Sequence, residues 1–525
     1  MLAAAGCRED DGRDYSFRYD ISDNPVTLDP QIADDLNSNI VIGNVFTGLL
    51  TLDADGSVKE GVASDYSVSE DGMTYSFTLR EDVYWVSSGG FEEKCVAEDF
   101  VYGFGRLFLP ETRAPRASEY YCIENSKLLN TGMIKDASLL GVRAKGDYEL
   151  EITLDYPNPR FLAMLAEPPA MPCSEKFFLQ SQGKYGLSGE CTPSNGSFYV
   201  RRWLYDPHTE DKDSNSIVLG RNAKNAETRD ICPSSVTVYI RDKEVFVEDF
   251  LGGDANCISV SESERERIKG DFSCGEYGIV TCGIAFNRSS ELFKSGDFCM
   301  ALALLTDRGA ILSVVSEFAP AEGIVPSQAS VLGKSYRGTA GSCKLPEYDV
   351  SAARTYFLRA QPQLDTGLFT GARIIVSDSA AETAVSYVMQ EWQREFGFYC
   401  VVEQLSGEDY KARLESGDYD IAVLELSGKY NGPSAYLEQF SSGSSENFTH
   451  FYDGEFEAAL ALAETAESSD NAERYLAAEQ ALIDKAAFIP LYCKNEYFFT
   501  AEGNTDILYD PFAKTVDFSS AKILD

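Results

Sequence analysis

The chain has 525 residues with 44% apolar and 12% aromatic side chains, enough for roughly two to four packed lobes. Its formal charge is −39, from 84 acidic and 45 basic residues. A surface this acidic repels phosphate groups, so nucleic acid is a poor candidate partner, and so is anionic lipid bound through a basic patch. No run of about 18 apolar residues is present, so the sequence predicts no membrane-spanning helix.

The N-terminal residues MLAAAGC resemble the end of a bacterial lipoprotein signal, in which small residues precede a cysteine that becomes lipidated. This pattern predicts Cys7 as the lipidation site, with residues 1–12 as a signal remnant and tether. The alternative is a cloning remnant that ends by chance in Ala-Gly-Cys.

Strand and helix patterns alternate along the first half of the chain, which predicts an α/β fold. Residues 15–21 alternate as a strand, and residues 37–50 have the apolar spacing of a helix. Turn residues at 53–56 and at 70–72 each predict a hairpin between short strands. A helix with an acidic first turn is predicted over 96–109.

The second half is richer in helices, with apolar residues three and four positions apart. The predicted helices cover residues 298–313, 380–396, 456–466 and 472–487. Residues 372–377 and 399–403 are typical of parallel strands in a βαβ unit. Residues 489–500 return to a strand pattern.

Thirteen cysteines are many for an exported protein, and none lies in a C-x-x-C pair. Several stand among apolar residues, as Cys299 and Cys493 do, and are predicted to be small buried side chains. Two alternatives stay open, namely reduced thiols throughout or a few disulfides.

The histidine content argues against hydrolytic chemistry. His208 and His450, the two histidines of the chain, lie in polar, loop-like segments without a nucleophile motif. The patterns G-x-S-x-G, H-E-x-x-H, P-loop and EF-hand are missing, and the two histidines offer little for a metal. The sequence therefore predicts a protein that is not an enzyme, with no cofactor and no metal site.

Several motifs occur in an order that resembles family 5 extracellular solute-binding proteins, the peptide- and nickel-binding subunits of bacterial ABC importers. The resemblance runs from about Leu28 to the C-terminus. Its motifs are LDP at 28–30, VFTGLL at 45–50, SEDG at 69–72, FTLREDVYW at 77–85, VAEDFVY at 96–102, NGSF at 195–198 and IPLY at 489–492.

The residues of these motifs also carry structural expectations of their own. Asn195 and Gly196 predict a tight turn with positive φ. Phe77 and Trp85 are predicted to pack in a core, and Asp99 is predicted to cap a helix or to meet its dipole.

The resemblance implies a type II periplasmic-binding-protein-like fold, with two lobes that close over a cleft and an extra third lobe. The connections near Thr281 and Lys494 would form the hinge. The implied lobes are residues 13–50, 190–280 and 495–525 for lobe I, 51–189 for lobe II (the extra lobe) and 281–494 for lobe III.

In this family the ligand lies in the cleft as an added extended strand, held through backbone groups. By position, the resemblance implies that two stretches flank the ligand. They are Asp34, Asp35 and Leu36 on one side, and Glu425, Leu426, Ser427, Lys429 and Tyr430 on the other.

The segment SGKYNGP at 427–433 departs from the family pattern, which places an Asp where Lys429 stands and an aromatic residue where Leu426 stands. That Asp holds the ammonium group of a bound peptide, so the exchange predicts a ligand that is not anchored there by a free N-terminus. Lys429 would instead meet a carboxylate or phosphate, and Glu425 would receive a cation. The alternative is that Lys429 pairs with Asp34 or Asp35 across the cleft.

The function implied is the substrate-binding subunit of a bacterial ABC importer, which captures a peptide or peptide-like solute and delivers it to permease subunits. The protein is expected to be a monomer on the extracellular face of the cytoplasmic membrane of a Gram-positive bacterium, lipid-anchored through Cys7. An extracellular sensor or adhesin with the same fold is the alternative, and an exported hydrolase ranks last.

Overall fold

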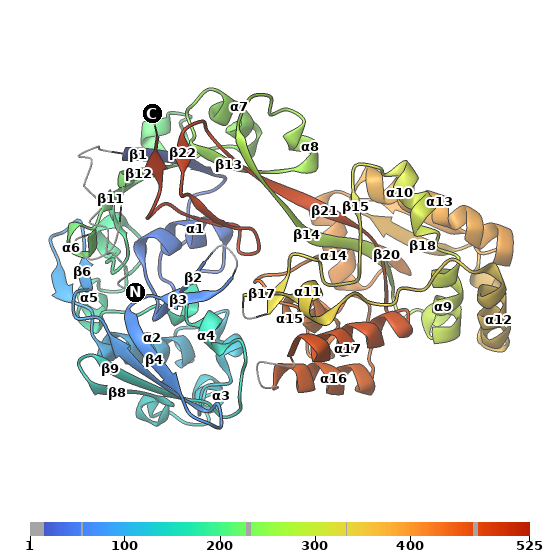
Figure 1. The fold of residues 1–525 in the computed structure, drawn as a ribbon, viewed down its shortest axis with the longest axis horizontal. Coiled ribbons are helices and arrows are strands. Elements are labelled where there is room, and N and C mark those ends of the chain that lie inside the picture. Colours follow the sequence, from blue (N-terminus) through green and yellow to red (C-terminus); the bar gives the residue numbers. More distant parts are fainter. Residues whose placement is uncertain are drawn as a thin grey trace, which may run out of the picture.

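The computed structural model describes residues 15–53, 56–226, 231, 233–331, 333–465 and 471–524. The predicted lipidation site Cys7 and the tether at 1–12 lie outside the described residues. Two masses of secondary structure lie side by side, and two long strands run from one mass to the other (Figure 1). No helix in the described part of the chain is both long and apolar enough to cross a bilayer.

The first mass, here called the first body, contains two four-stranded sheets. One sheet pairs the N-terminal strand in parallel with a strand more than 200 residues later in the chain. Its strands, in spatial order, are β1 (Tyr15–Ile21), β12 (Pro233–Ile240), β11 (Ser216–Arg221) and β10 (Phe198–Leu204). The other sheet consists of β4 (Ala63–Val68), β5 (Thr74–Leu79), β9 (Glu149–Thr153) and β8 (Val142–Gly146).

The hairpins and the long helix predicted for the first half are present in this body. Strands β2 (Leu50–Leu52) and β3 (Val58–Glu60) pair antiparallel, as do β4 and β5. Helix α2 (Ala97–Phe108) covers the range expected from its acidic first turn. The Asp99 carboxylate accepts hydrogen bonds from the backbone N–H of Val96 and from the indole N–H of buried Trp85, both at 2.9 Å. The predicted capping role of Asp99 is confirmed.

The second mass, the second body, is built on the largest sheet. The sheet has the order β13 (Cys257–Ser261), β21 (Phe488–Thr500), β14 (Ser273–Phe286), β20 (Ile421–Ser427), β18 (Ala372–Val376) and β19 (Cys400–Gln404). Strands β18 and β19 are parallel and are joined through α13 (Ser379–Phe396), which confirms the predicted βαβ unit.

Strands β14 and β21 connect the two bodies. They pair antiparallel from Ser273 opposite Thr500 to Ala285 opposite Phe488. At the first-body end β21 also pairs with β13, and at the second-body end β14 also pairs with β20. The register shifts between Gly278 and Val280 and again between Cys282 and Gly283, so the paired strands are irregular near their middle.

The apolar clusters divide in the same way as the two bodies. One cluster joins residues from both sheets of the first body and from the C-terminal segment, such as Ile42, Phe77, Val236 and Phe518. Two further clusters belong to the second body and lie on opposite faces of its sheet. Phe512, between β23 (Leu508–Asp510) and β24 (Thr515–Asp517), lies in the first body but joins a cluster of the second body.

Helix α1 (Leu36–Val45) is shorter than the predicted 37–50 because its C-terminus is held by a distant side chain. The Asn195 Oδ1 atom accepts from the Thr47 N–H at 3.0 Å, and its Nδ2 donates to the Thr47 carbonyl at 2.8 Å. The prediction of positive φ at Asn195 and Gly196 is wrong. Glycine is needed at 196 for close approach, because a Cβ there would lie 2.7 Å from the Val45 carbonyl carbon.

The single helix predicted over 298–313 is two helices, α9 (Gly296–Leu304) and α10 (Arg308–Val314). The Asp307 carboxylate accepts from the Ala310 N–H at 3.0 Å, so it caps a new helix within the apolar repeat. Helices α16 (Gly454–Glu464) and α17 (Asn471–Asp484) lie close to their predicted positions.

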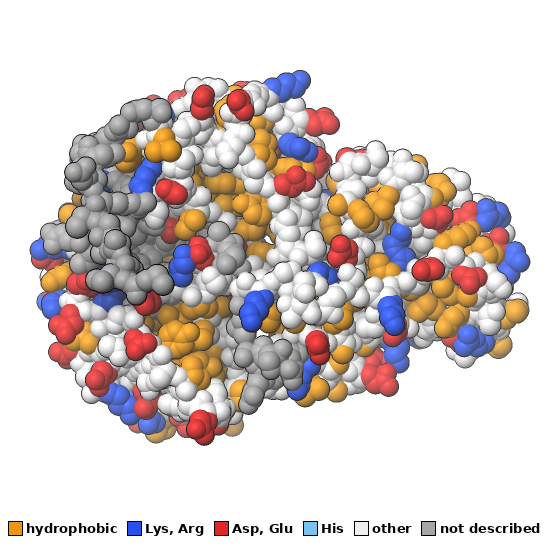
Figure 2. Space-filling model, viewed as in Figure 1, with side chains coloured by type: hydrophobic (Ala, Val, Ile, Leu, Met, Phe, Trp, Pro, Cys, Tyr) orange, Lys and Arg blue, Asp and Glu red, His pale blue; other side chains and the backbone are white. Residues whose placement is uncertain are grey.

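Cysteines contribute no cross-links in the described part of the chain. Its eleven cysteines are all free, and eight of them are buried, as predicted for Cys299 and Cys493. Acidic side chains are scattered among basic ones over the visible face rather than gathered in one patch (Figure 2).

Candidate functional site

The carboxyl ends of β18 and β20 meet at one edge of the large sheet, because the two strands are parallel neighbours. Ligands of α/β sheets bind outside the carboxyl ends of the strands. Residues 377–378 follow β18, and residues 428–433 follow β20. Because β14 and β21 leave the sheet beside β20 toward the first body, this carboxyl edge is the candidate site.

Glu425 lies in an ion-paired cluster at the edge. Its Oε1 is 2.8 Å from the Lys494 ammonium and accepts a 2.8 Å hydrogen bond from the Ser377 hydroxyl. Lys494 also pairs with Asp378, whose carboxylate caps α13. Burial alone would raise the pKa of Asp378, but the Ala381 N–H and Lys494 bring it below its ordinary value. The cation predicted to meet Glu425 is therefore already supplied by the protein.

Leu426 and Ser427 have different environments because side chains alternate along β20. Leu426 is buried in the same apolar cluster as Tyr436 and Ile279. Ser427 is exposed, and its carbonyl accepts from the Gln439 amide at 3.0 Å. The Leu that replaces the family aromatic is a core residue here, and its side chain contributes to packing below the edge.

Lys429 extends into solvent, with 69% of its side chain exposed, and its ammonium lies 2.8 Å from Glu446 Oε1. In this structure Lys429 pairs with Glu446 and not with Asp34 or Asp35. Asp35 caps α1 instead, accepting from the Ser38 N–H at 2.8 Å and from its hydroxyl at 2.6 Å, while Asp34 is exposed. An exposed pair such as Lys429 with Glu446 stabilises by about 0–1 kcal/mol, so a ligand can displace it at little cost.

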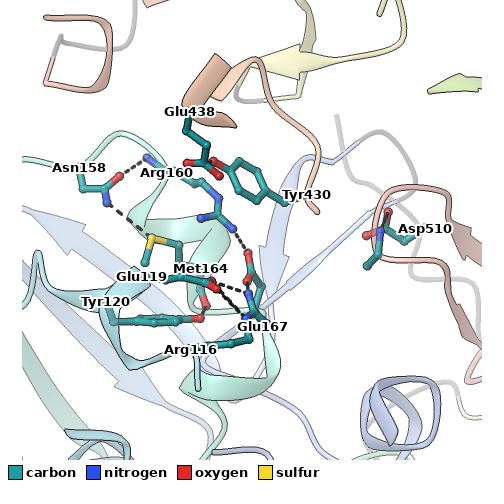
Figure 3. Close-up of polar contacts among 11 residues, drawn as sticks. Arg116, Glu119, Tyr120, Asn158, Arg160, Met164, Glu167, Tyr430, Glu438 and Asp510 are labelled. Carbon is teal, nitrogen blue, oxygen red and sulfur yellow. Dashed lines mark hydrogen bonds and ion pairs between the residues drawn. The ribbon is translucent and has the colours of Figure 1, made fainter. Parts of the chain in front are cut away.

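The side chain of Tyr430 contacts residues of both bodies. The guanidinium of Arg160, from the first body, lies 3.2 Å from the centre of the Tyr430 ring. The Tyr430 hydroxyl donates to Glu438 Oε2 at 3.2 Å (Figure 3). The phenol is thus enclosed between a cation of one body and a carboxyl group of the other.

Arg160 belongs to a charge network within the first body (Figure 3). It pairs with Glu167, which also lies 2.5 Å from Arg116, and Arg116 donates three hydrogen bonds from Nε and Nη2 to Glu119. The side chains of Arg160, Glu167 and Arg116 are 22%, 14% and 18% exposed. Two basic and two acidic groups therefore balance one another close to the site.

Two carboxyl groups on the second-body side have raised pKa values. Burial raises the pKa of Glu438 to about 7, against the opposing effect of Arg160 and with a contribution from Glu464. Burial also raises the pKa of Glu464, although the Ser434 hydroxyl donates to it at 2.7 Å. Glu167 behaves in the opposite way, since Arg160 and Arg116 outweigh its burial and lower its pKa.

The sequence analysis did not find Arg160, Glu167 or Glu438. Arg160 follows the loop YPNP at 156–159 and has no motif around it. Its partner Tyr430 is 270 positions later, so the contact depends on how the two bodies are placed. An arginine in a proline-containing loop has no neighbouring sequence pattern that would predict a contact with the other body.

Other parts of the described structure provide weaker candidates for a binding site. A hollow of about 500 Å³ on the second body, lined by residues that include Arg288, His450 and Lys485, lies away from the carboxyl edge. Its cations have partners, since Lys485 pairs with Asp453 and Arg288 donates to the Ala486 carbonyl. In the described ranges, no three His, Cys, Asp or Glu side chains are grouped to hold a metal.

Curated relatives match nearly the full length of the chain. Oligopeptide-binding protein OppA of Bacillus subtilis (strain 168) is 26% identical over 494 residues, covering 91% of this chain and 87% of that protein. The Dipeptide-binding protein of Lactococcus lactis subsp. cremoris is 25% identical and covers 94% and 91%. The Probable deoxycholate-binding periplasmic protein YgiS of Escherichia coli is 25% identical and covers 91% and 87%.

Solved structures have the same fold. The Escherichia coli murein tripeptide binding protein MppA superposes with a TM-score of 0.73 at 21% identity, covering 98% of this chain and 99% of that one. Listeria monocytogenes OppA bound to peptide gives a TM-score of 0.70 at 21% identity, with the same coverage. Residues 57–448 match the family model "Bacterial extracellular solute-binding proteins, family 5 Middle". The chain therefore belongs to the bacterial extracellular solute-binding proteins of family 5.

Proposed function

We propose that this protein is the substrate-binding subunit of a bacterial ABC importer and captures a peptide or peptide-like solute by closure of its two bodies. Members of its family are solute-binding proteins that work outside the cytoplasm, not enzymes. The observation that carries the proposal is the β14–β21 connection, which leaves the large sheet beside the candidate site. Bending of these strands would move the first body toward the carboxyl edge.

The proposed ligand lies along the carboxyl edge as an added extended strand. The backbone groups of Glu425, Leu426 and Ser427 flank it on one side, and those of Asp34, Asp35 and Leu36 on the other. Leu36, at the start of α1, is 42% exposed and so has apolar surface left to cover. In lobe terms, the cleft lies between lobe I and lobe III, with lobe II as the extra lobe.

Lys429 sets the chemistry proposed for the ligand. It is an exposed cation whose one described carboxylate partner, Glu446, is itself 38% exposed. A carboxylate or phosphate on the ligand would replace Glu446, whereas a free ammonium group would be repelled. The favoured cargo is therefore a peptide-like solute with an anionic group near this position, and not a peptide held by its N-terminus.

Cargo outside the peptides is a second candidate. The relative named for deoxycholate, an anionic amphipathic molecule, is as similar to this chain as the relatives named for peptides. The exposed Lys429 suits the carboxylate of such a molecule, and the exposed side chain of Leu36 at the start of α1 suits its apolar frame. The proposed partners are ABC permease subunits, and the proposed anchor is a lipid on Cys7 of the monomer.

Binding of matched peptides tests the proposal. Tripeptides with a free or acetylated N-terminus, and with a free or amidated C-terminus, are titrated by calorimetry beside deoxycholate. Dependence on the carboxylate but not on the amine is expected. A strong dependence on the free amine contradicts the Lys429 proposal, and absence of binding by every compound contradicts the cargo class. A ligand at 100 times its Kd would stabilise the protein by about 2.7 kcal/mol, which a thermal shift detects.

A further inference from the structure

The two bodies contact one another at the ligand segment itself, residues 427–433. Arg160 covers the Tyr430 ring from the first body. The next residue, Asn431, faces the turn that joins β2 to β3, because a Cβ on Gly56 would lie 2.9 Å from Asn431 Nδ2. The Asn431 Oδ1 in turn accepts from the Ser330 N–H at 2.8 Å. Tyr430 and Asn431, two consecutive residues of the segment, therefore lie against two separate loops of the first body.

Arg160 is held in position by residues of the first body. The Asn158 Oδ1 accepts from the Arg160 N–H at 2.9 Å, which sets the backbone at the start of α4 (Phe161–Met164). Glu167 pairs with the guanidinium and is held in place by Arg116. Because its own body determines its position, Arg160 presents a preformed flat surface rather than a mobile side chain.

The contact crosses the boundary between units that have separate cores. The loops that carry Gly56 and Arg160 belong to the body whose apolar cluster runs from β1 to the C-terminal segment. Tyr430 and Asn431 follow β20, which packs in the clusters of the second body. Any bending of β14 and β21 that separates the bodies must break the Arg160–Tyr430 contact.

We propose that Arg160 is a positioning residue for the ligand segment: it fastens residues 427–433 to the first body and so sets how the two bodies close. Arg160 acts through Tyr430 and the adjacent Lys429, with no direct contact to the ligand. The inference rests on the proposed function only in taking 427–433 as the ligand segment.

Hydrogen exchange of the ligand-free protein, read by mass spectrometry, tests the fastening. In Arg160→Ala and Tyr430→Leu, the amides of 427–433 are expected to exchange about tenfold faster, as a contact over an aromatic face is lost. Tyr430→Phe retains the ring and is expected to exchange like the wild type. Arg160→Lys keeps the charge without the flat guanidinium and is expected to fall between. Arg143→Ala, on an exposed position of β8 in the same body, is the matched control.

Small-angle X-ray scattering measures the radius of gyration, which would not change if Arg160 ordered residues 427–433 alone. The radius of gyration of Arg160→Ala and Tyr430→Leu is expected to increase, because the bodies open, while Arg143→Ala keeps the wild-type value. If Arg160→Ala exchanges like the wild type at 427–433, or opens no further in scattering, the proposal is overturned. If Arg160→Ala exchanges faster over the whole chain, that variant is unfolded and the two Tyr430 variants decide. Faster exchange at 427–433 in Tyr430→Leu than in Tyr430→Phe supports the proposal, and equal exchange overturns it.

No ligand takes part in either measurement. A failed cargo screen therefore leaves the Arg160 role standing, and a failed exchange test leaves the cargo proposal standing. The double variant of Arg160→Ala with Tyr430→Leu should exchange no faster than either single variant, since both remove one shared contact.

Discussion

Lys429 and Tyr430 are neighbours in sequence with opposite situations. Lys429 reaches solvent and has an exposed partner, whereas Tyr430 is covered by Arg160 and bonded to Glu438. The weak ion pair of Lys429 can be displaced by a ligand at little cost, while the contacts of Tyr430 hold the backbone of the segment in place. This combination suits a site that selects its ligand by the charge of the group that meets Lys429.

Lys429→Asp restores the carboxylate that the family places at this position. We expect the ratio of Kd values for acetylated over free-amine tripeptides to rise by about tenfold or more, because a repulsive contact becomes attractive. Calorimetry of the paired peptides measures it. Lys429→Gln removes the cation without adding a carboxylate and should give a smaller rise. An unchanged ratio in Lys429→Asp would place the ligand ends elsewhere.

Glu438 makes stability depend on pH. Burial raises its pKa to about 7, so the folded protein holds this proton more tightly than the unfolded chain does. The stabilising contribution is complete below about pH 4.5, where the unfolded carboxyl titrates, and is lost as the pH rises through about 7.

Glu438→Gln is therefore expected to raise the melting temperature at pH 8 relative to the wild type, and to have little effect at pH 5. Thermal unfolding at the two pH values measures the difference. Glu408→Gln, at an exposed position of α14 (Gly407–Ser416), is the control and should show no such dependence. An equal shift at both pH values would count against a raised pKa for Glu438.

At the scale of elements, α1 begins at residues that we propose flank the ligand, and its first turn is capped by the side chain of Asp35. Asp35 binds both the N–H and the hydroxyl of Ser38. The same residue was predicted to flank the ligand through its backbone. Stability and binding can therefore be separated at this position.

Asp35→Ala is expected to destabilise the protein by about 1 kcal/mol, whereas Asp35→Asn keeps an acceptor and should be close to neutral. Urea unfolding followed by tryptophan fluorescence, to which buried Trp85 of the first body contributes, compares them. If only the backbone at 35 meets the ligand, Asp35→Asn leaves Kd unchanged. A large loss of affinity in Asp35→Asn would instead assign the carboxylate to the ligand.

Local patterns predicted many elements of this chain, since α2, α13 and the βαβ unit lie where spacing and caps placed them. The errors have long-range causes. Helix α1 ends early because Asn195, 148 residues away, binds Thr47. At the site, the sequence pointed to the Lys429 segment, but the partner of Lys429 and the role of Arg160 depend on the packing of two bodies, which no local pattern encodes.

At the scale of the whole molecule, the fold is held without cross-links in its described part. The eleven described cysteines are free, and most of them are buried among apolar side chains. Burial raises the pKa of Cys299 to about 11 and that of Cys122 likewise, which keeps these thiols protonated and unreactive at neutral pH.

Titration with Ellman's reagent in denaturant, without reductant, is expected to give at least eleven thiols per chain, whereas the native protein should react at few of them. Exposed Cys274 should react first. Reduction before denaturation is the control and should add little. A count well below eleven would mean that disulfides form in the described part of the chain.

The two strands that join the bodies have a mechanical consequence. Because β14 and β21 are hydrogen-bonded to each other along their length, they form one two-stranded ribbon and not two independent connections. A two-stranded ribbon flexes easily across its flat side and resists bending in its own plane, and its pairing is irregular beside Gly278 and Gly283. In the proposed closure, the pairing of β14 with β21 would therefore restrict the directions in which one body can move relative to the other, with or without a ligand.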